Sequence, residues 1–136
     1  MIIYLYRVGR NLNRAYRTCE AFGVTDLCLI ECDGKIEGNL FKAKGNVNIQ
    51  EVSDFPTSWG LLALETTYQT PIWEIPFWAV QSILIGGETG GLPCRIEAEY
   101  QACIPMVGRV SGLTVEAALA ITLYEERRQR GVSDHL

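Results

Sequence analysis

Residues 83–93 read Ile-Leu-Ile-Gly-Gly-Glu-Thr-Gly-Gly-Leu-Pro. This stretch begins as a short apolar strand and continues into a loop that holds four glycines between residues 86 and 91. No Lys-Ser or Lys-Thr follows, which excludes a Walker A loop, and the spacing fails the Gly-x-Gly-x-x-Gly dinucleotide pattern. Ligands of an open parallel sheet bind at the carboxyl ends of its strands. Two interpretations therefore stay open: a loop whose backbone approaches a ligand closely, or a tight turn whose Glu88 faces water.

Apolar segments on both sides of this stretch predict the remaining strands. They lie at Ile2–Val8, Val24–Cys32, Leu61–Thr67, Ile83–Ile85 and Ala102–Pro105, with one short element near Val47–Val52. A first helix is expected over Leu12–Phe22, capped by Asn11 and ended by Gly23. A second covers Thr114–Arg130, where Leu113, Ala117, Ile121 and Tyr124 recur on one face. This alternation predicts an α/β fold, a mainly parallel sheet flanked by helices.

Length and composition set the class of protein. The chain has 136 residues, of which 48% are hydrophobic and 21% charged, and this predicts a single domain over residues 1–136. No run approaches the ~20 apolar residues that a membrane span needs. The N-terminal residues lack the basic and apolar regions of a signal peptide. We therefore expect a soluble protein of the cytoplasm without a membrane partner.

The five cysteines form no Cys-x-x-Cys pair, and the single histidine is His135. These counts exclude the usual structural zinc patterns, so no metal is expected. Cys28 and Cys32 lie in an apolar run and are predicted to be buried thiols, which fits a reducing compartment. The three tryptophans are more typical of a core or a dimer interface than of base stacking: Trp59, Trp73 and Trp78.

Charge is unevenly distributed around a net value of −4. Residues 1–50 carry seven basic and five acidic side chains, whereas residues 51–126 carry two basic and ten acidic ones. The first helix holds Arg14 and Arg17, with Arg10 before its cap and Arg7 upstream. This spacing fits an RNA lying against one helix face and equally a solvated face neutralised by acidic residues such as Glu20.

Three segments carry the strongest pattern. The first is residues 11–23, in which an asparagine precedes Arg17-Thr18 and the last two residues are Phe-Gly. The second is the glycine loop at residues 86–91. The third runs from Ile104-Pro105-Met106 to Leu113 and into the last helix. Alone, this segment reads as a plain connection or as a helix entrance that offers backbone donors. In this order, the three segments resemble the motifs of the SpoU (TrmH) branch of the SPOUT RNA methyltransferases.

The resemblance implies a C-terminal deep trefoil knot, S-adenosylmethionine (SAM) as cofactor, and a homodimer whose site draws on both chains. The small size resembles the TrmL-type enzymes, which methylate a ribose 2′-hydroxyl at the tRNA wobble nucleotide. We accordingly expect tRNA as substrate, with rRNA second. The positions that match cofactor contacts are Leu64, Glu65, Thr66, Gly86, Gly87, Ile104, Met106, Gly112 and Leu113.

On the RNA side, Arg17 matches the arginine that helps to activate the ribose hydroxyl. Since arginine is a poor base, with a pKa above ~12, Arg17 is expected to orient a phosphate and to stabilise developing negative charge. Asn11 and Glu88 match polar residues that shape the site, and Arg7, Arg10 and Arg14 are the candidate RNA contacts.

This chain departs from the family pattern at four positions. Gly112-Leu113-Thr114 stands where Ser-Leu-Asn is common, Glu116 replaces a serine, and Asn13 replaces a glycine. A catalytically impaired RNA- or cofactor-binding protein with the same fold is therefore the alternative hypothesis. An unrelated nucleotide-binding α/β domain that uses the glycine loop is a third.

Overall fold

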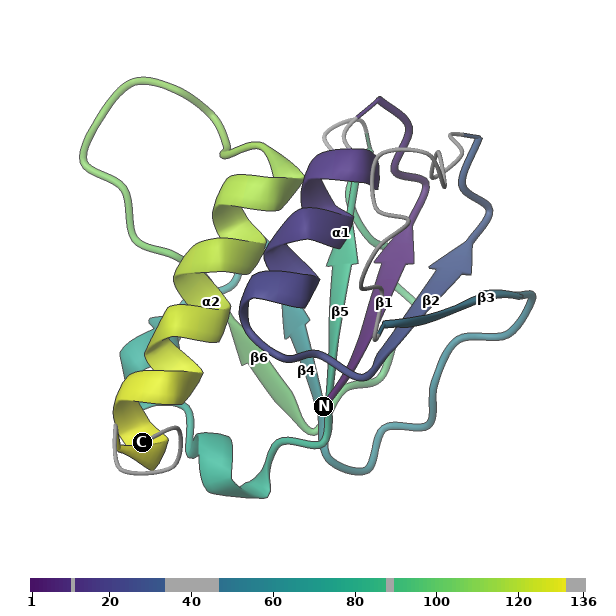
Figure 1. Ribbon diagram of the computed structural model, residues 1–136. Helices are drawn as coiled ribbons and strands as arrows, with labels where there is room; N and C mark the ends of the chain where they lie inside the picture. The colour runs from purple at the N-terminus through teal and green to yellow at the C-terminus, as the bar shows by residue number, and fades with distance from the viewer. Residues whose placement is uncertain (11, 34–46, 88–89, 132–136) are drawn as a thin grey trace.

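The computed structural model describes residues 1–10, 12–33, 47–87 and 90–131. Its elements are β1 (Ile2–Tyr6), α1 (Leu12–Ala21), β2 (Asp26–Ile30), β3 (Asn48–Val52), β4 (Leu61–Leu64), the 3₁₀ turns η2 (Ile72–Glu74) and η3 (Phe77–Ala79), β5 (Ser82–Gly86), β6 (Tyr100–Ala102) and α2 (Val115–Arg130). The strands form one sheet in the order β3-β2-β1-β5-β4-β6 (Figure 1). All five strand pairings are parallel, which confirms the predicted α/β class.

The register brings the carboxyl ends of the central strands to one edge of the sheet. Tyr6 at the end of β1 pairs with Ile30 of β2 and with Gly86 of β5, and Leu64 of β4 pairs with Ile85. These strands are near-continuous apolar runs because both faces of a central parallel strand are buried. The loops that follow β1, β4 and β5 therefore begin side by side.

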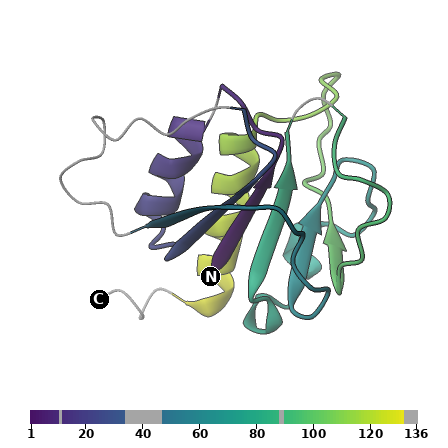
Figure 2. The same ribbon diagram turned by 90° about the vertical axis from the view of Figure 1, so that its right-hand side faces the viewer.

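Both helices lie on the same face of the sheet, next to each other (Figures 1 and 2). Helix α1 buries Leu12, Ala15, Tyr16 and Cys19, the i, i+3, i+4, i+7 pattern of an amphipathic helix. It ends at Ala21, one residue before the predicted end at Phe22, and Gly23 follows with a φ of +71° that suits glycine. Figure 2 shows loops on the opposite face, where Phe55, Leu92 and Ile96 pack on a second, smaller apolar cluster.

Two strands end earlier than the sequence predicts. β1 stops at Tyr6 and β2 at Ile30, because the next residues, Arg7 and Glu31, have φ values of +54° and +50°. This left-handed conformation interrupts an extended strand. The Arg7 and Glu31 side chains then pair across the edge of the sheet, with Nη2 and Oε1 3.0 Å apart.

Two further strands also have boundaries that differ from the prediction. β4 ends at Leu64 instead of Thr67. The last strand is Tyr100–Ala102 instead of Ala102–Pro105, because its pairing with β4 runs from Leu62↔Tyr100 to Leu64↔Ala102. The short element near Val47–Val52 is confirmed as β3.

The apolar stripe predicted on the last helix is not the one that the sheet covers. Helix α2 buries Val115, Leu119, Thr122 and Leu123 against the sheet. Ile121 and Tyr124, from the predicted face, are 40% and 65% exposed. The helix carries a second apolar stripe, and the sheet covers only one of the two. No helix among the described residues is long and apolar enough to cross a bilayer.

All three tryptophans are exposed, so none belongs to the core of the chain. The five cysteines are free thiols. Cys28 is buried as predicted, whereas Cys32 is only half-buried, and its thiol donates to the carbonyl of Leu5. Burial raises the pKa of the Cys19 thiol to about 12, so this group stays protonated and unreactive at neutral pH.

Candidate functional site

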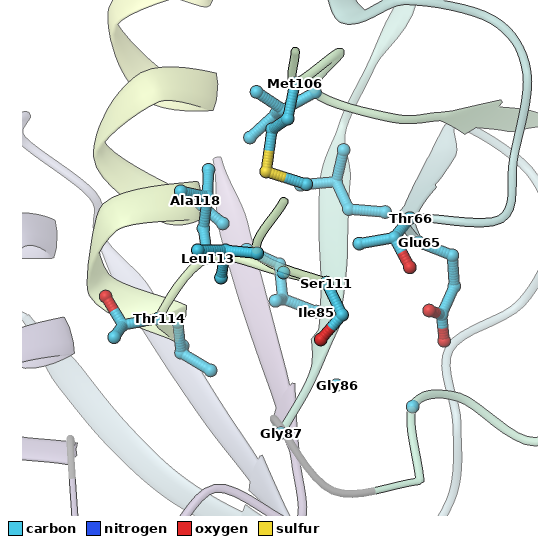
Figure 3. A pocket seen from close by; sticks show the side chains of 16 residues that line it. Glu65, Thr66, Ile85, Gly86, Gly87, Met106, Ser111, Leu113, Thr114 and Ala118 are labelled. Atoms are coloured by element: carbon cyan, nitrogen blue, oxygen red, sulfur yellow. The ribbon is translucent and has the colours of Figure 1, made fainter. Parts of the chain in front are cut away.

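A cavity of about 640 Å³ opens at the carboxyl ends of β4 and β5 (Figure 3). Its other sides are the segment that follows β6 and the first turn of α2. The cavity lies within the ~300–1,000 Å³ range of small-molecule sites. Its lining residues are Leu64, Glu65, Thr66, Ile85, Gly86, Gly87, Gly91, Ile104, Met106, Val110, Ser111, Gly112, Leu113, Thr114, Val115 and Ala118.

All nine residues predicted to contact the cofactor line this one cavity. They come from three separate segments, at residues 64–66, 86–87 and 104–113, which only the parallel sheet brings together. In Figure 3, Met106 lies at one end of the cavity, and Gly86 and Gly87 at the other. Apolar side chains and exposed backbone make up most of the lining of the cavity, and the Thr66 and Ser111 hydroxyls are among its polar groups.

Gly86 and Gly87 must be glycine because of contacts within the chain that the sequence does not reveal. A Cβ on Gly87 would lie 2.3 Å from the carbonyl oxygen of Arg7, and one on Gly86 would lie 3.1 Å from the carbonyl carbon of Gly91. The backbone N–H of Gly87 donates to the carbonyl of Tyr6 at 2.7 Å. The close approach that these two glycines require is thus to the chain's own backbone.

The sequence reasoning missed seven lining residues. They are Ile85, Gly91, Val110, Ser111, Thr114, Val115 and Ala118. Each lies inside or beside a segment that the motifs had already marked, so proximity in sequence was the available signal. What the sequence could not show is how far each loop folds over the cavity.

The candidate RNA-side arginines lie outside the cavity. Arg7, Arg10, Arg14 and Arg17 are exposed, and none lines it. Helix α1 begins at Leu12, so Arg10 precedes the helix and does not continue its arginine face. The hydrogen bonds that Arg7 donates to the Glu31 carboxylate hold the pKa of Arg7 above its usual value. Two predicted polar site residues, Asn11 and Glu88, lie outside the described residues.

Arg14 joins the two helices. Its Nη1 lies 3.5 Å from Oε1 of Glu116 in the first turn of α2, so its acidic partner comes from the other helix. The second oxygen, Oε2 of Glu116, is buried and accepts no hydrogen bond from the described part of the chain. Glu116 is the position where the family pattern has a serine, and the carboxylate is stabilised there by the helix N-terminus.

The family profile described as "SpoU rRNA Methylase family" matches residues 1–124. Since this match covers most of the 136 residues, the chain belongs to that family, which confirms the resemblance drawn from the three motifs.

Two curated relatives come from Synechocystis sp. (strain ATCC 27184 / PCC 6803 / Kazusa). One, named an uncharacterized tRNA/rRNA methyltransferase, is 27% identical over an alignment of 135 positions that covers 88% of this chain and 49% of that protein. The other, a putative tRNA (cytidine(34)-2′-O)-methyltransferase, is 26% identical over an alignment of 140 positions that covers 90% of this chain and 91% of the relative. The chain thus spans about half the length of the first relative and nearly all of the second.

Two solved structures extend the comparison. A structure concerned with "the 2-OH methylation of C/U34 on tRNA" superposes with a TM-score of 0.78 at 25% identity, over 95% of this chain and 89% of that one. An AdoMet-bound rRNA methyltransferase from Sinorhizobium meliloti superposes with a TM-score of 0.77 at 25% identity, over 93% of this chain and 55% of that one. These matches confirm the fold class.

Proposed function

We propose that this chain is a SAM-dependent RNA methyltransferase that transfers a methyl group to a ribose 2′-hydroxyl, with tRNA as the favoured substrate and rRNA second. One observation carries the proposal: the nine predicted cofactor residues, from three distant segments, line a single cavity. The similarity to a putative tRNA (cytidine(34)-2′-O)-methyltransferase over 91% of its length supports the choice of tRNA.

The cavity fits SAM in size and chemistry. It has the volume for a nucleoside with an amino-acid tail, and its apolar side chains suit the faces of an adenine. Among the described residues beyond its chain neighbours, a Cβ on Gly112 would have only Thr66 Cγ2 within 4 Å, at 3.7 Å, so the backbone there borders open space. Leu64, Glu65 and Thr66 would flank the adenosine. The remaining walls would come from Gly86, Gly87, Ile104, Met106, Gly112 and Leu113.

Bound SAM supplies a methyl group made reactive by its positive sulfonium. The residues of the chain must then position the nucleophile, because a ribose 2′-hydroxyl reacts poorly without orientation and proton removal. Arg17 orients a backbone phosphate and stabilises the negative charge that develops on the ribose oxygen. Arg7, Arg10 and Arg14 hold the RNA, and Asn11 and Glu88 shape its entry. Deep knotting of the C-terminal segments would present the loops that hold the cofactor.

A homodimer completes the site in this proposal. An apolar groove of about 500 Å³ runs along the outer stripe of α2 and includes Trp73, Ile121 and Tyr124. Such a surface on a small domain suits burial by a second copy. Because Arg17 lies outside the cavity of its own chain, a dimer would let it act beside the cavity of its partner. The free thiols suit a reducing cytoplasm, where we place the protein.

The second candidate function is RNA or cofactor binding without turnover. Gly112 and Thr114, which replace a serine and an asparagine of the family pattern, line the cavity, and Glu116 adds a buried carboxylate oxygen next to them. These changes affect substrate orientation more than cofactor binding, because the cofactor is held largely by backbone groups and apolar walls.

The deciding experiment is methyl transfer from labelled SAM to unmodified tRNA, followed by nuclease digestion and mass spectrometry of the nucleosides. The enzyme proposal expects a single 2′-O-methylated nucleoside. SAM binding without any methylated product, in tRNA or rRNA, would favour the second candidate. Gly112→Ser with Thr114→Asn should then produce turnover if the protein is a decayed enzyme.

A further inference from the structure

Glu65 links three elements at the edge of the cavity. It directly follows β4, and its backbone N–H donates to the carbonyl of Ala102 in β6 at 3.1 Å. Its carboxylate Oε1 accepts a short hydrogen bond from the backbone N–H of Leu92. One residue therefore connects the end of β4 with the chain that returns from the glycine loop.

The backbone around Gly91 is shaped to fit this carboxylate. Gly91 has a φ of +61°, and a Cβ there would lie 2.5 Å from Glu65 Oε1. Gly90 has a φ of +84°, but no atom of the described residues other than its chain neighbours lies within 4 Å of its Cβ position. Gly91 is thus glycine for two reasons, conformation and contact, whereas Gly90 is glycine for conformation alone.

The same contact reaches the floor of the cavity. A Cβ on Gly86 would lie 3.1 Å from the carbonyl carbon of Gly91 and 3.2 Å from Leu92 Cδ2, so β5 ends directly against the segment that Glu65 holds. Glu65 and Gly91 line both the main cavity and a neighbouring cavity of about 420 Å³. They form the partition between the two.

Glu65 has no salt bridge to a cation of the described ranges, so the structure gives it no ion-pairing task. A half-buried carboxylate without a cation costs solvation free energy, and the amide of Leu92 offsets this cost with a charge-assisted hydrogen bond. We propose that Glu65 is a positioning residue: it fixes residues 90–92 as the wall of the cofactor cavity, so that SAM meets a preformed site. The inference rests on the proposed function only for the identity of the ligand.

The test compares two backbone-to-carboxylate contacts at opposite ends of β4. Glu65→Ala removes the acceptor for Leu92, and Glu65→Gln keeps an acceptor oxygen in the same place. Glu99→Ala is the matched control, because Glu99 accepts from the backbone N–H of Gly60 at 2.7 Å, far from the cavity edge. The readouts are SAM affinity by calorimetry, the KM for SAM against kcat, and hydrogen exchange at the Leu92 amide without SAM.

Glu65→Ala should weaken SAM binding about 10-fold or more, raise KM with little change in kcat, and expose the Leu92 amide to exchange. Glu65→Gln should restore binding to within about 3-fold of wild type, since a neutral acceptor loses only part of the hydrogen bond. Glu99→Ala should leave both SAM affinity and Leu92 exchange unchanged.

A second pair of variants tests the contact without altering Glu65. Gly91→Ala and Gly90→Ala impose similar left-handed strain, but only the first drives a methyl group into the Glu65 carboxylate. Gly91→Ala should therefore weaken SAM binding well beyond Gly90→Ala, and adding Glu65→Ala to Gly91→Ala should cause little further loss. Equal effects of the two glycine variants would overturn the inference.

Two other results would also overturn it. The first is a Leu92 amide that stays protected in Glu65→Ala. The second is a Glu65→Gln variant that binds SAM as weakly as Glu65→Ala while Leu92 stays protected, because the carboxylate would then contact the cofactor itself. Failure of the wild-type chain to bind SAM would instead refute the proposed function, and Leu92 exchange would still decide whether Glu65 holds the loop.

Discussion

Gly87→Ala is the substitution for which the structure predicts the largest local effect. The added Cβ would lie 2.3 Å from the carbonyl oxygen of Arg7 and 3.0 Å from its carbonyl carbon, both backbone atoms that cannot rotate away. Relaxed carbon–oxygen contacts lie near 3.3–3.6 Å, so β1 and β5 must separate by roughly 1 Å at their carboxyl ends.

The separation of β1 and β5 lowers the free energy of unfolding by an amount that can be bounded. It strains a packed region, typically about 1–3 kcal/mol, and weakens the bond from the Gly87 N–H to the Tyr6 carbonyl, about 1 kcal/mol net. We expect Gly87→Ala to lower the free energy of unfolding by about 2–4 kcal/mol. With an m value of about 2 kcal/mol/M, the urea midpoint followed by circular dichroism should fall by about 1–2 M.

Gly108→Ala is the control for this measurement. Apart from its chain neighbours, no atom in the described part of the chain would lie within 4 Å of a Cβ there, so the unfolding midpoint should stay at the wild-type value or rise slightly. If Gly87→Ala unfolds within about 0.5 kcal/mol of wild type, the range of ordinary surface substitutions, the account of this glycine as a backbone contact is wrong.

Three other predictions concern the RNA side and the dimer. Arg17→Ala should abolish methyl transfer with SAM affinity nearly intact, and a collapse of that affinity in calorimetry would contradict its assignment to RNA. Arg10→Glu with Arg14→Glu should weaken tRNA binding and flatten its dependence on salt in filter-binding titrations, whereas an unchanged slope would remove these residues from the RNA footprint. Tyr124→Glu puts a charge into the apolar groove and should yield monomers in sedimentation velocity, while Trp78→Ser, at an exposed residue outside the groove, should stay dimeric. A Tyr124→Glu protein that sediments like wild type would place the dimer interface elsewhere.

The sequence predicted the cavity far better than it predicted the edges of the elements. The family resemblance supplied nine residues that line the cavity, six of them in the second and third motifs and three at the end of the strand predicted over Leu61–Thr67, because such positions reflect contacts to a ligand wherever the fold brings them. The strand ends at Arg7 and Glu31 escaped prediction, because neither residue type signals a positive φ and their pairing across 24 residues is visible only in the fold.

The helix faces show a different limit. Leu113, Ala117, Ile121 and Tyr124 form a genuine apolar stripe, but α2 has a second stripe at Val115, Leu119 and Leu123, and periodicity alone does not say which one the sheet covers. Gly87 illustrates the same point for loops. A glycine at this position suggested that the loop backbone approaches a ligand, whereas in the structure the Arg7 carbonyl occupies the space that a Cβ would need.

The proposed function requires that the cavity between β4, β5 and the start of α2 binds SAM. Isothermal titration of the chain with SAM, and separately with S-adenosylhomocysteine, tests it most directly. We expect micromolar affinity for both ligands at one site per chain or per dimer, about −8 kcal/mol at 1 μM. Absence of binding by either ligand at millimolar concentration would contradict it, because the glycine loops would then not form a cofactor pocket.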